Sequence, residues 1–406
     1  MNITDVGHLS GDTDTGKDKM IEEAKKENKE VLEIAKFYTE AFKNDFKLLN
    51  LRWPQIVIPA TSCIDVYIEM ISKLIDKDIA YLSNNNVYFD TSKLKNYYTL
   101  TNQSSEEMIV GARDTVSEDT GKRNKSDFVL WFTKSKFENH ALKWNSPWGE
   151  GYPGWHIECS GISYKYLGEY LDIHCGGVDN KFPHHTNEIA QSESFLGHKW
   201  CNYWFHVEHL NGKNGKMSKS SGEFITISGL KERGYNPLIY KFFCLQSHYR
   251  RELIFSFEGM DSAKKAYTKL ISKIDSLQNQ GEIDNDSVLL YQNKFKEALS
   301  NDLNTSSAIT VLFDVLKSEL NDNTKKYLIK DFDTVLSLDL NQSNSIDDSI
   351  ELDDTLKKNI LEKIEERYEA KRNKNYEKAD NIKNDLLTMN IELIDTREGT
   401  QYRIIK

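Results

Sequence analysis

Long hydrophobic runs are absent from this sequence of 406 residues. No apolar stretch approaches the ~20 residues that a helix needs to span a membrane, and the N-terminus does not resemble a signal peptide. We therefore expect a cytoplasmic protein with no membrane partner.

Cysteine and positive charge are also scarce. The five cysteines are an odd number without framework spacing, so a disulfide scaffold is not expected. The net charge of −10 argues against a protein that coats nucleic acid by bulk attraction, although an acidic body can still carry a local basic face.

The chain is long enough for two or three domains, and a hydrophobic content of 38% is adequate for packed cores. Apolar periodicity predicts a strand that starts at residue 2, helices over 18–49 and 64–75, and a hairpin over 79–89. A polar, loop-rich segment over 93–126 precedes further strands at 127–131 and 204–210.

The region from 154 to 188 carries the first chemical signal. Residues 170–174 form a plausible buried strand, Gly176 and Gly177 turn the chain, and Pro183 suits the first turn of a helix. A strand, a glycine turn and a helix start together predict a ligand crevice of the α/β type.

Three residues of this region form a candidate metal site. His184 and Glu188 are four apart and share a helix face, and Cys159 can supply a thiolate from the preceding element. Sulfur, imidazole and carboxylate ligands suit zinc. The alternative is that Cys159 is a small core residue and His184 a capping or surface residue.

A second signal is the glycine-, lysine- and serine-rich loop at 212–222. Lys216 and Lys219, three apart in a mobile loop, can close on a polyphosphate and stabilise charge on its leaving group. The alternative is a solvated basic loop.

From residue 230 onward the pattern is almost entirely helical. Helices are predicted over 236–246, 257–279, 287–299, 305–321 and 354–389, with a linker at 339–354 and a small terminal hairpin. Basic residues of the last helices and hairpin either bind RNA or form a solvated charged face. They are Lys371, Arg372, Lys374, Arg397 and Arg403.

Several motifs, in order along the whole chain, resemble those of cysteinyl-tRNA synthetase, a class I synthetase. They are Asn-Ile-Thr-Asp-Val at 2–6, Gly-Trp-His-Ile-Glu-Cys at 154–159, Phe-Pro-His-His at 182–185, Lys-Met-Ser-Lys-Ser at 216–220 and Gly-Thr-Gln-Tyr-Arg at 399–403. The lysine loop alone is shared by many class I synthetases, whereas the cysteine, histidine and glutamate set is specific to this kind.

The resemblance implies an α/β fold: a Rossmann-like parallel sheet, incomplete at the N-terminus, with an inserted connective subdomain and an all-α C-terminal region. The expected parts are the two halves of the catalytic domain at 1–77 and 146–229, the insertion at 78–145, a stem-contact helical region at 230–285, a helical bundle at 286–370 and an anticodon-side region at 371–406.

The resemblance also implies an activity and its partners. The family activates L-cysteine with ATP, supplied with Mg, and transfers it to tRNA(Cys). It carries one zinc ion per chain, which binds the substrate thiolate and so selects against serine. We expect a monomer.

By matching position, the resemblance assigns roles to individual residues. The zinc ligands would be Cys159, His184 and Glu188. The cysteine pocket would be lined by Thr4, Trp155 and Asp179, with Asp179 pairing the α-ammonium group. Lys219 would hold the ATP phosphates, and Lys216 and His174 complete the expected catalytic residues.

The sequence departs from the family pattern in three places. Cys175 and Thr186 stand where the family more often has Gly and Glu. The family's first strand, a fourth zinc ligand (a cysteine) and a His-Ile-Gly-His motif would all precede Asn2. Since the first strand is central in a doubly wound sheet, we expect a divided sheet, and a Met1 that is internal to a longer protein or begins a truncated product.

Two alternatives remain open from the sequence. The chain could use cysteinyl-adenylate to transfer cysteine to a small amine, or it could be an inactive protein that binds only tRNA or zinc.

Overall fold

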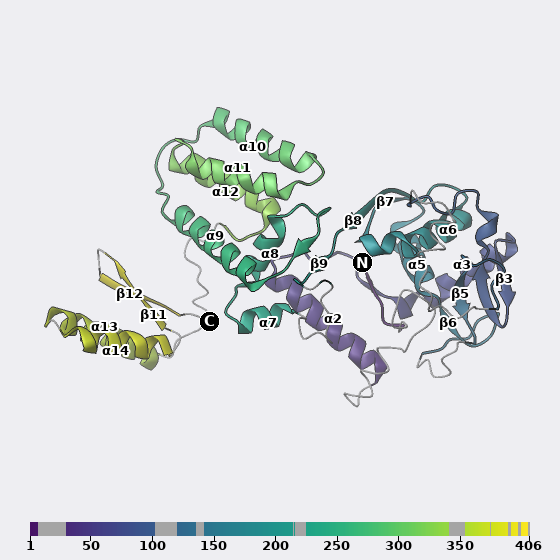
Figure 1. Ribbon diagram of the computed structural model, residues 1–406, viewed down its shortest axis with the longest axis horizontal. Helices are drawn as coiled ribbons and strands as arrows, with labels where there is room; N and C mark the ends of the chain where they lie inside the picture. Colours follow the sequence, from purple (N-terminus) through teal and green to yellow (C-terminus); the bar gives the residue numbers. More distant parts are fainter. Residues whose placement is uncertain are drawn as a thin grey trace.

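The computed structural model describes residues 1–6, 30–101, 120–134, 142–213, 215, 225–340, 354–373, 375–388, 391–396 and 399–404. The ribbon view shows the elements described between residues 58 and 207 gathered on the right, the helical bundle of residues 237–336 above the centre, and the last helices and hairpin on the left (Figure 1). Among these residues no helix is both long and apolar enough to cross a membrane.

The N-terminal strand β1 (Asn2–Ile3) pairs in parallel with β2 (Ile58–Pro59). The Asp5 carboxylate accepts hydrogen bonds from the backbone N–H of Thr61, at 2.9 Å, and from its hydroxyl, at 2.7 Å. This contact fixes the short strand against the turn η1 (Ala60–Cys63), which leads into α3 (Ile64–Asp76). The predicted strand and the helix over 64–75 are therefore present.

The helix predicted over 18–49 is described as α2 (Val31–Leu48). Residues 7–29 lie outside the described part of the chain, so the predicted first third of that helix is not tested. The capping box between Glu30 and Glu33 gives α2 a defined beginning.

The insertion is built on a four-stranded antiparallel sheet in the order β3-β4-β5-β6. Its strands are β3 (Ala80–Ser83), β4 (Asn86–Phe89), β5 (Phe128–Phe132) and β6 (Tyr152–Pro153). Asn84 and Asn85 both adopt positive φ, as a tight hairpin turn requires, so the predicted hairpin over 79–89 is confirmed.

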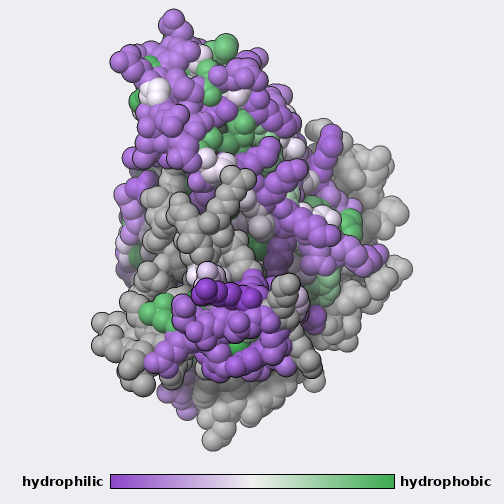
Figure 2. All heavy atoms as spheres, turned by 90° about the vertical axis from the view of Figure 1, so that its left-hand side faces the viewer, coloured by the Kyte–Doolittle hydropathy of each residue, from purple (hydrophilic) through white to green (hydrophobic). Residues whose placement is uncertain are grey.

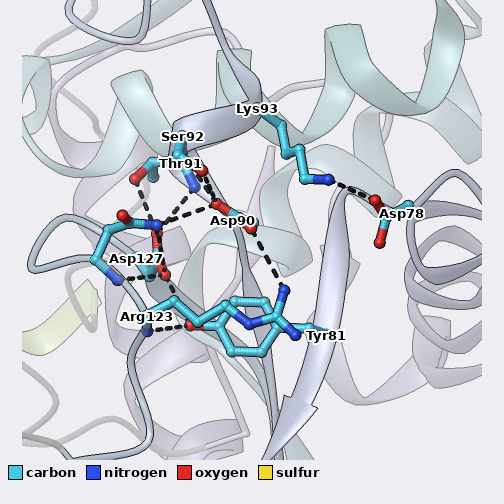
Figure 3. A network of polar contacts seen from close by, with 9 residues as sticks. Asp78, Tyr81, Asp90, Thr91, Ser92, Lys93, Arg123 and Asp127 are labelled. Atoms are coloured by element: carbon cyan, nitrogen blue, oxygen red, sulfur yellow. Dashed lines mark hydrogen bonds and ion pairs between the residues drawn. The ribbon is translucent and has the colours of Figure 1, made fainter.

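A polar network with a buried carboxylate at its centre lies within this insertion (Figure 3). Asp127 is 1% exposed, and its carboxylate accepts bonds from the Tyr81 hydroxyl at 2.7 Å, the Thr91 N–H at 2.9 Å and the Asn124 N–H at 2.9 Å. Arg123 lies over the ring of Tyr81. The network joins strand β3 to the segments before β5, although these are distant in sequence.

The central region places two helices against two strands. Its elements are α5 (Trp155–Leu167), β7 (Leu171–Gly177), η3 (Val178–Lys181), α6 (His184–Leu196) and β8 (Cys201–Val207). Strand β7 pairs in parallel with β8. Within the described residues, β1-β2 and β7-β8 are separate two-stranded sheets, as the expectation of a divided sheet required.

Two details of the predicted strands are corrected. The strand predicted over 204–210 begins earlier and ends at Val207, because Leu210 belongs to β9 (Leu210–Asn211), which pairs in parallel with β10 (Leu253–Ile254). The strand predicted over 170–174 runs from Leu171 to Gly177, and it is not buried as expected, since Ile173 is 56% exposed. Gly176 and Gly177 were expected to turn the chain, but both belong to the strand and pair with β8, and the chain turns after them in η3.

The helical half is confirmed, with two helices that the periodicity did not reveal. Its helices are α7 (Ile227–Glu232), α8 (Pro237–Leu245), α9 (Phe257–Asp275), α10 (Asn285–Ser300), α11 (Thr305–Lys317) and α12 (Asp322–Leu336). The missed helices are the six-residue α7 and α12, whose polar first turn obscures the apolar stripe of Leu328, Ile329, Phe332 and Leu336. One core cluster runs through α7 to α12.

The last part of the chain contains two helices where one was predicted. They are α13 (Asp354–Arg372) and α14 (Tyr376–Thr388), followed by the antiparallel hairpin of β11 (Ile391–Thr396) and β12 (Gly399–Ile404). The predicted terminal hairpin is thus confirmed. The described surface on the side of these elements is mostly hydrophilic (Figure 2).

The Asp127 network yields a stability prediction. Replacing Asp127 with Asn turns an acceptor into a donor that faces the buried Thr91 N–H and Tyr81 hydroxyl, which should cost about 2 kcal/mol or more. Amides of β4 and β5 should then exchange with solvent about 30-fold faster, as measured by hydrogen exchange.

The matched control is Asp78→Asn, which removes the ion pair between Asp78 and Lys93 at the surface and keeps a residue that tolerates the positive φ of this position. This change should leave hydrogen exchange of the β4 and β5 amides nearly unchanged, because exposed ion pairs contribute little to stability. Equal effects of the two substitutions would contradict the assigned importance of the network.

Candidate metal and amino-acid site

Helices α5 and α6 bring the three predicted metal ligands together. Cys159 Sγ lies 3.6 Å from His184 Nε2, and His184 Nε2 lies 2.8 Å from Glu188 Oε1. The three ligand atoms all lie within 4.8 Å of one another. Glu188 is fully buried and His184 nearly so, because α6 is covered along most of its length.

The outer side of this cluster is held by two more histidines. Nδ1 of His184 lies 2.8 Å from Nδ1 of His156, which leaves Nε2 of His184 to face Cys159 and Glu188. Glu188 Oε2 lies 3.0 Å from Nε2 of His174. Metal-binding histidines and carboxylates commonly have such outer partners, which fix the orientation of the ligand.

The charges of the cluster depend on one another. Burial favours the protonated form of Glu188, but the neighbouring His184 and His174 outweigh burial and hold the pKa of Glu188 well below its usual range. Although burial disfavours the charged form of His174, the Glu188 carboxylate raises the pKa of that imidazole. The carboxylate is therefore an anion that two imidazoles compensate.

The pKa of the Cys159 thiol is shifted in the opposite direction, above its ordinary value. Burial, followed by the nearby carboxylates of Glu188 and Glu158, raises the pKa of Cys159 well above its ordinary value, while a hydrogen bond from Asn2 opposes the rise. A cation bound beside the sulfur would reverse this preference, because a coordinated thiol is deprotonated.

A second, overlapping group of donors lies beside the first and shares Glu188 with it. His174, His185 and Glu188 also bring one ligand atom each within 4.8 Å of the others. His185 Nδ1 lies 2.8 Å from His206 Nε2 of β8. Burial lowers the pKa of His185 to about 3 and that of His206 to about 4, so both imidazoles are neutral at physiological pH.

Gly176 allows this second group to form. A Cβ atom at position 176 would lie 2.6 Å from Cε1 of His185 and 2.7 Å from the Asn180 amide nitrogen. The first glycine of the predicted turn is therefore required for the close approach of β7 to the ring of His185.

The donor set fits a zinc ion at Cys159, His184 and Glu188. It combines one sulfur, one imidazole nitrogen and one carboxylate oxygen, the ligand types that zinc takes. The outer contacts of His184 and Glu188 match the expected arrangement around such ligands. The overlapping group of His174, His185 and Glu188 offers two imidazoles and a carboxylate but no sulfur donor.

The structure places three of the remaining predicted residues, namely Trp155, Thr4 and Asp179. Trp155, the first residue of α5, lies against the ring of His184, with ring centroids 4.1 Å apart and ring planes tilted by 32°. Thr4 is exposed just after β1, and Asp179 lies in η3 with its carboxylate against Gly177. Lys216 and Lys219 lie outside the described residues, so the structure does not place them.

Four residues near the cluster were not identified from sequence: Asn2, His156, His185 and His206. His156 had a usable signal, because it precedes Cys159 by three positions on one helix face. Asn2 and His206 come from distant strands, and only the tertiary fold reveals them.

Models of known families define the class of the chain. Residues 2–265 match the catalytic domain of class I tRNA synthetases of the cysteine type, described as "tRNA synthetases class I (C) catalytic domain". Residues 294–340, which include α11 and α12, match the DALR domain.

Curated relatives make the assignment specific. The chain is 42% identical to a cysteine–tRNA ligase of Treponema denticola and 42% identical to one of Borrelia garinii, each over 99% of this chain and 86% of the relative. It is 38% identical to a cysteine–tRNA ligase of Chlorobaculum tepidum, over 99% of this chain and 84% of the relative. The chain belongs to the cysteine–tRNA ligase family.

The geometry predicts how the metal responds to substitution. The purified chain should hold about one zinc ion per molecule by elemental analysis. Cys159→Ser should remove most of it, because a neutral hydroxyl replaces the thiolate. The matched control is Cys175→Ser, which changes an exposed cysteine of β7 and should retain the metal.

The same experiment separates the two groups of donors. If zinc occupied His174, His185 and Glu188 instead, Cys159→Ser would keep its metal while His185→Ala would lose it. That pattern would contradict the assignment.

Proposed function

We propose that this chain activates L-cysteine with ATP to form cysteinyl-adenylate and pyrophosphate, and then transfers cysteine to tRNA(Cys). The observation that carries the proposal is the sulfur, imidazole and carboxylate cluster of Cys159, His184 and Glu188, found in a chain of the cysteine–tRNA ligase family. Tryptophan and a polar loop flank this cluster, as an amino-acid pocket requires.

The proposed metal is zinc, held by Cys159, His184 and Glu188. When bound, it would supply a Lewis-acid position that prefers a substrate thiolate to a hydroxyl. The protein contributes to this selection by holding the ligands in fixed positions. His156 sets the ring orientation of His184, and His174 neutralises and orients Glu188.

The other predicted residues have proposed roles around this cluster. Trp155, lying against His184, forms an apolar wall for the side chain of cysteine. Asp179 would pair with the α-ammonium group, and Thr4 would line the same pocket. For His174, its contact with Glu188 favours an orienting role over direct contact with the reacting atoms.

ATP is the proposed second substrate, bound with Mg. Lys219 would contact the phosphates, and Lys216 would help to stabilise the charge that develops on pyrophosphate. The chain that leads into their loop is anchored, because β9 pairs with β10 and Lys213 lies 3.1 Å from Glu258 of α9.

The helical half supports tRNA as the acceptor, since it includes a DALR domain and ends in the hairpin β11-β12. A small amine as acceptor would give the helical half no role in the reaction.

We further propose a cytoplasmic monomer. We also propose the domain limits expected from the sequence, with one exception. Strand β6, at residues 152–153, pairs with the insertion sheet although it lies beyond the expected limit of the insertion at residue 145.

Amino-acid activation provides the test. The chain should catalyse ATP–pyrophosphate exchange with cysteine at least about 100-fold faster than with serine, and removal of zinc by a chelator should abolish the cysteine reaction. Charging of tRNA(Cys) should follow the same metal dependence.

Exchange without charging would favour a small-amine acceptor and overturn the tRNA step. A folded, zinc-loaded chain that neither exchanges pyrophosphate nor binds tRNA would overturn the proposed function. A chain that uses serine as well as cysteine would contradict the role given to the metal cluster.

A further inference from the structure

The side chain of Asn2 reaches the metal cluster from the other end of the sequence. Its amide nitrogen Nδ2 lies 3.4 Å from Sγ of Cys159, a contact between residues 157 positions apart. This distance is within the range of a hydrogen bond to sulfur. Asn2 therefore touches the one ligand of the cluster that neither His156 nor His174 supports.

The backbone around Asn2 is held firmly enough to aim this side chain. Asn2 pairs with Ile58 in the parallel ladder of β1 and β2, and the Ile58 N–H donates to the carbonyl of Met1 at 3.0 Å. Further along, Asp5 is bonded twice to Thr61. Because side chains alternate along a strand, this register sends the Asn2 side chain to the α5 side and Ile3 to the other.

The chemistry of the contact requires a neutral donor. Only the amide N–H₂ of asparagine can donate to sulfur, and it does so without adding charge. The surroundings of Cys159 already include two fully buried glutamates, Glu158 and Glu188. An N–H donor offsets the repulsion that these carboxylates exert on a thiolate, whereas an aspartate at position 2 would increase it.

We propose that Asn2 is a positioning residue of the metal centre: its amide donates a hydrogen bond to Cys159 Sγ and holds the thiolate in place as a ligand. This inference rests on the metal site of the proposed function. It gives each of the three ligands one outer partner, namely Asn2 for Cys159, His156 for His184 and His174 for Glu188.

The test compares Asn2→Ala and Asn2→Asp with the unchanged chain. Zinc affinity is measured by competition with a chromophoric chelator, and the thiolate is monitored through the sulfur-to-cobalt charge-transfer band of the cobalt-substituted protein. Asn2→Ala should weaken zinc binding by about 10-fold and shift the band, as loss of an outer partner does. Asn2→Asp, of nearly equal size, should weaken it further.

The chain offers a matched control in Asn211→Ala. Asn211 also lies in a two-residue parallel strand, β9, but its amide donates to Glu252, away from the cluster. This variant should leave zinc affinity and the cobalt band unchanged. Circular dichroism confirms that each variant is folded.

The outcomes separate the two proposals. If Cys159→Ala binds zinc as tightly as the unchanged chain, the metal site itself is wrong. If Cys159→Ala abolishes binding but both Asn2 variants keep the original affinity and band, the metal site stands and the role of Asn2 is overturned. An equal loss in Asn211→Ala would also overturn it, because the effect would then be one of general stability.

Discussion

A carboxylate removed from water is costly unless opposite charge or donors surround it, and Glu188 has no exposed surface. Its two oxygens face two imidazoles, His184 at 2.8 Å and His174 at 3.0 Å. This arrangement keeps Glu188 ionised and joins two elements, because α6 carries Glu188 and His184, and β7 carries His174. Cys159, on α5, forms a metal site only together with this fixed pair.

The scaffold around the pair is correspondingly rigid. Gln191 of α6 donates to the Ser160 hydroxyl and the His156 carbonyl of α5, each at 2.6 Å. The insertion reaches the same helix through the Tyr97 hydroxyl, which donates to Asn187. A misplacement of about 1 Å can disable a site, so the position of α6 has to be fixed. These hydrogen bonds fix it, which explains why polar residues occupy buried positions of α6 where a simple core would have apolar residues.

The sequence predicted the parts of the site that depend on local spacing. His184 and Glu188 share a face because they are four residues apart. The glycines at 176 and 177 were expected to turn the chain, whereas the structure places both in β7 and uses Gly176 for a close approach to His185. The sequence did not predict the outer partners Asn2 and His206, because their positions depend on strand pairing over long distances. The helix α12 was missed for a local reason, since its polar first turn resembles a linker.

The most direct test of the account is X-ray absorption at the zinc edge, recorded on the zinc-loaded chain alone, with cysteine and with serine. The account predicts one sulfur ligand in the free chain, from Cys159, a second sulfur when cysteine is added, and no change with serine. A zinc ion without sulfur in the free chain, or the same spectrum with both amino acids, would contradict the claim that this cluster holds the metal and recognises the thiol of the substrate.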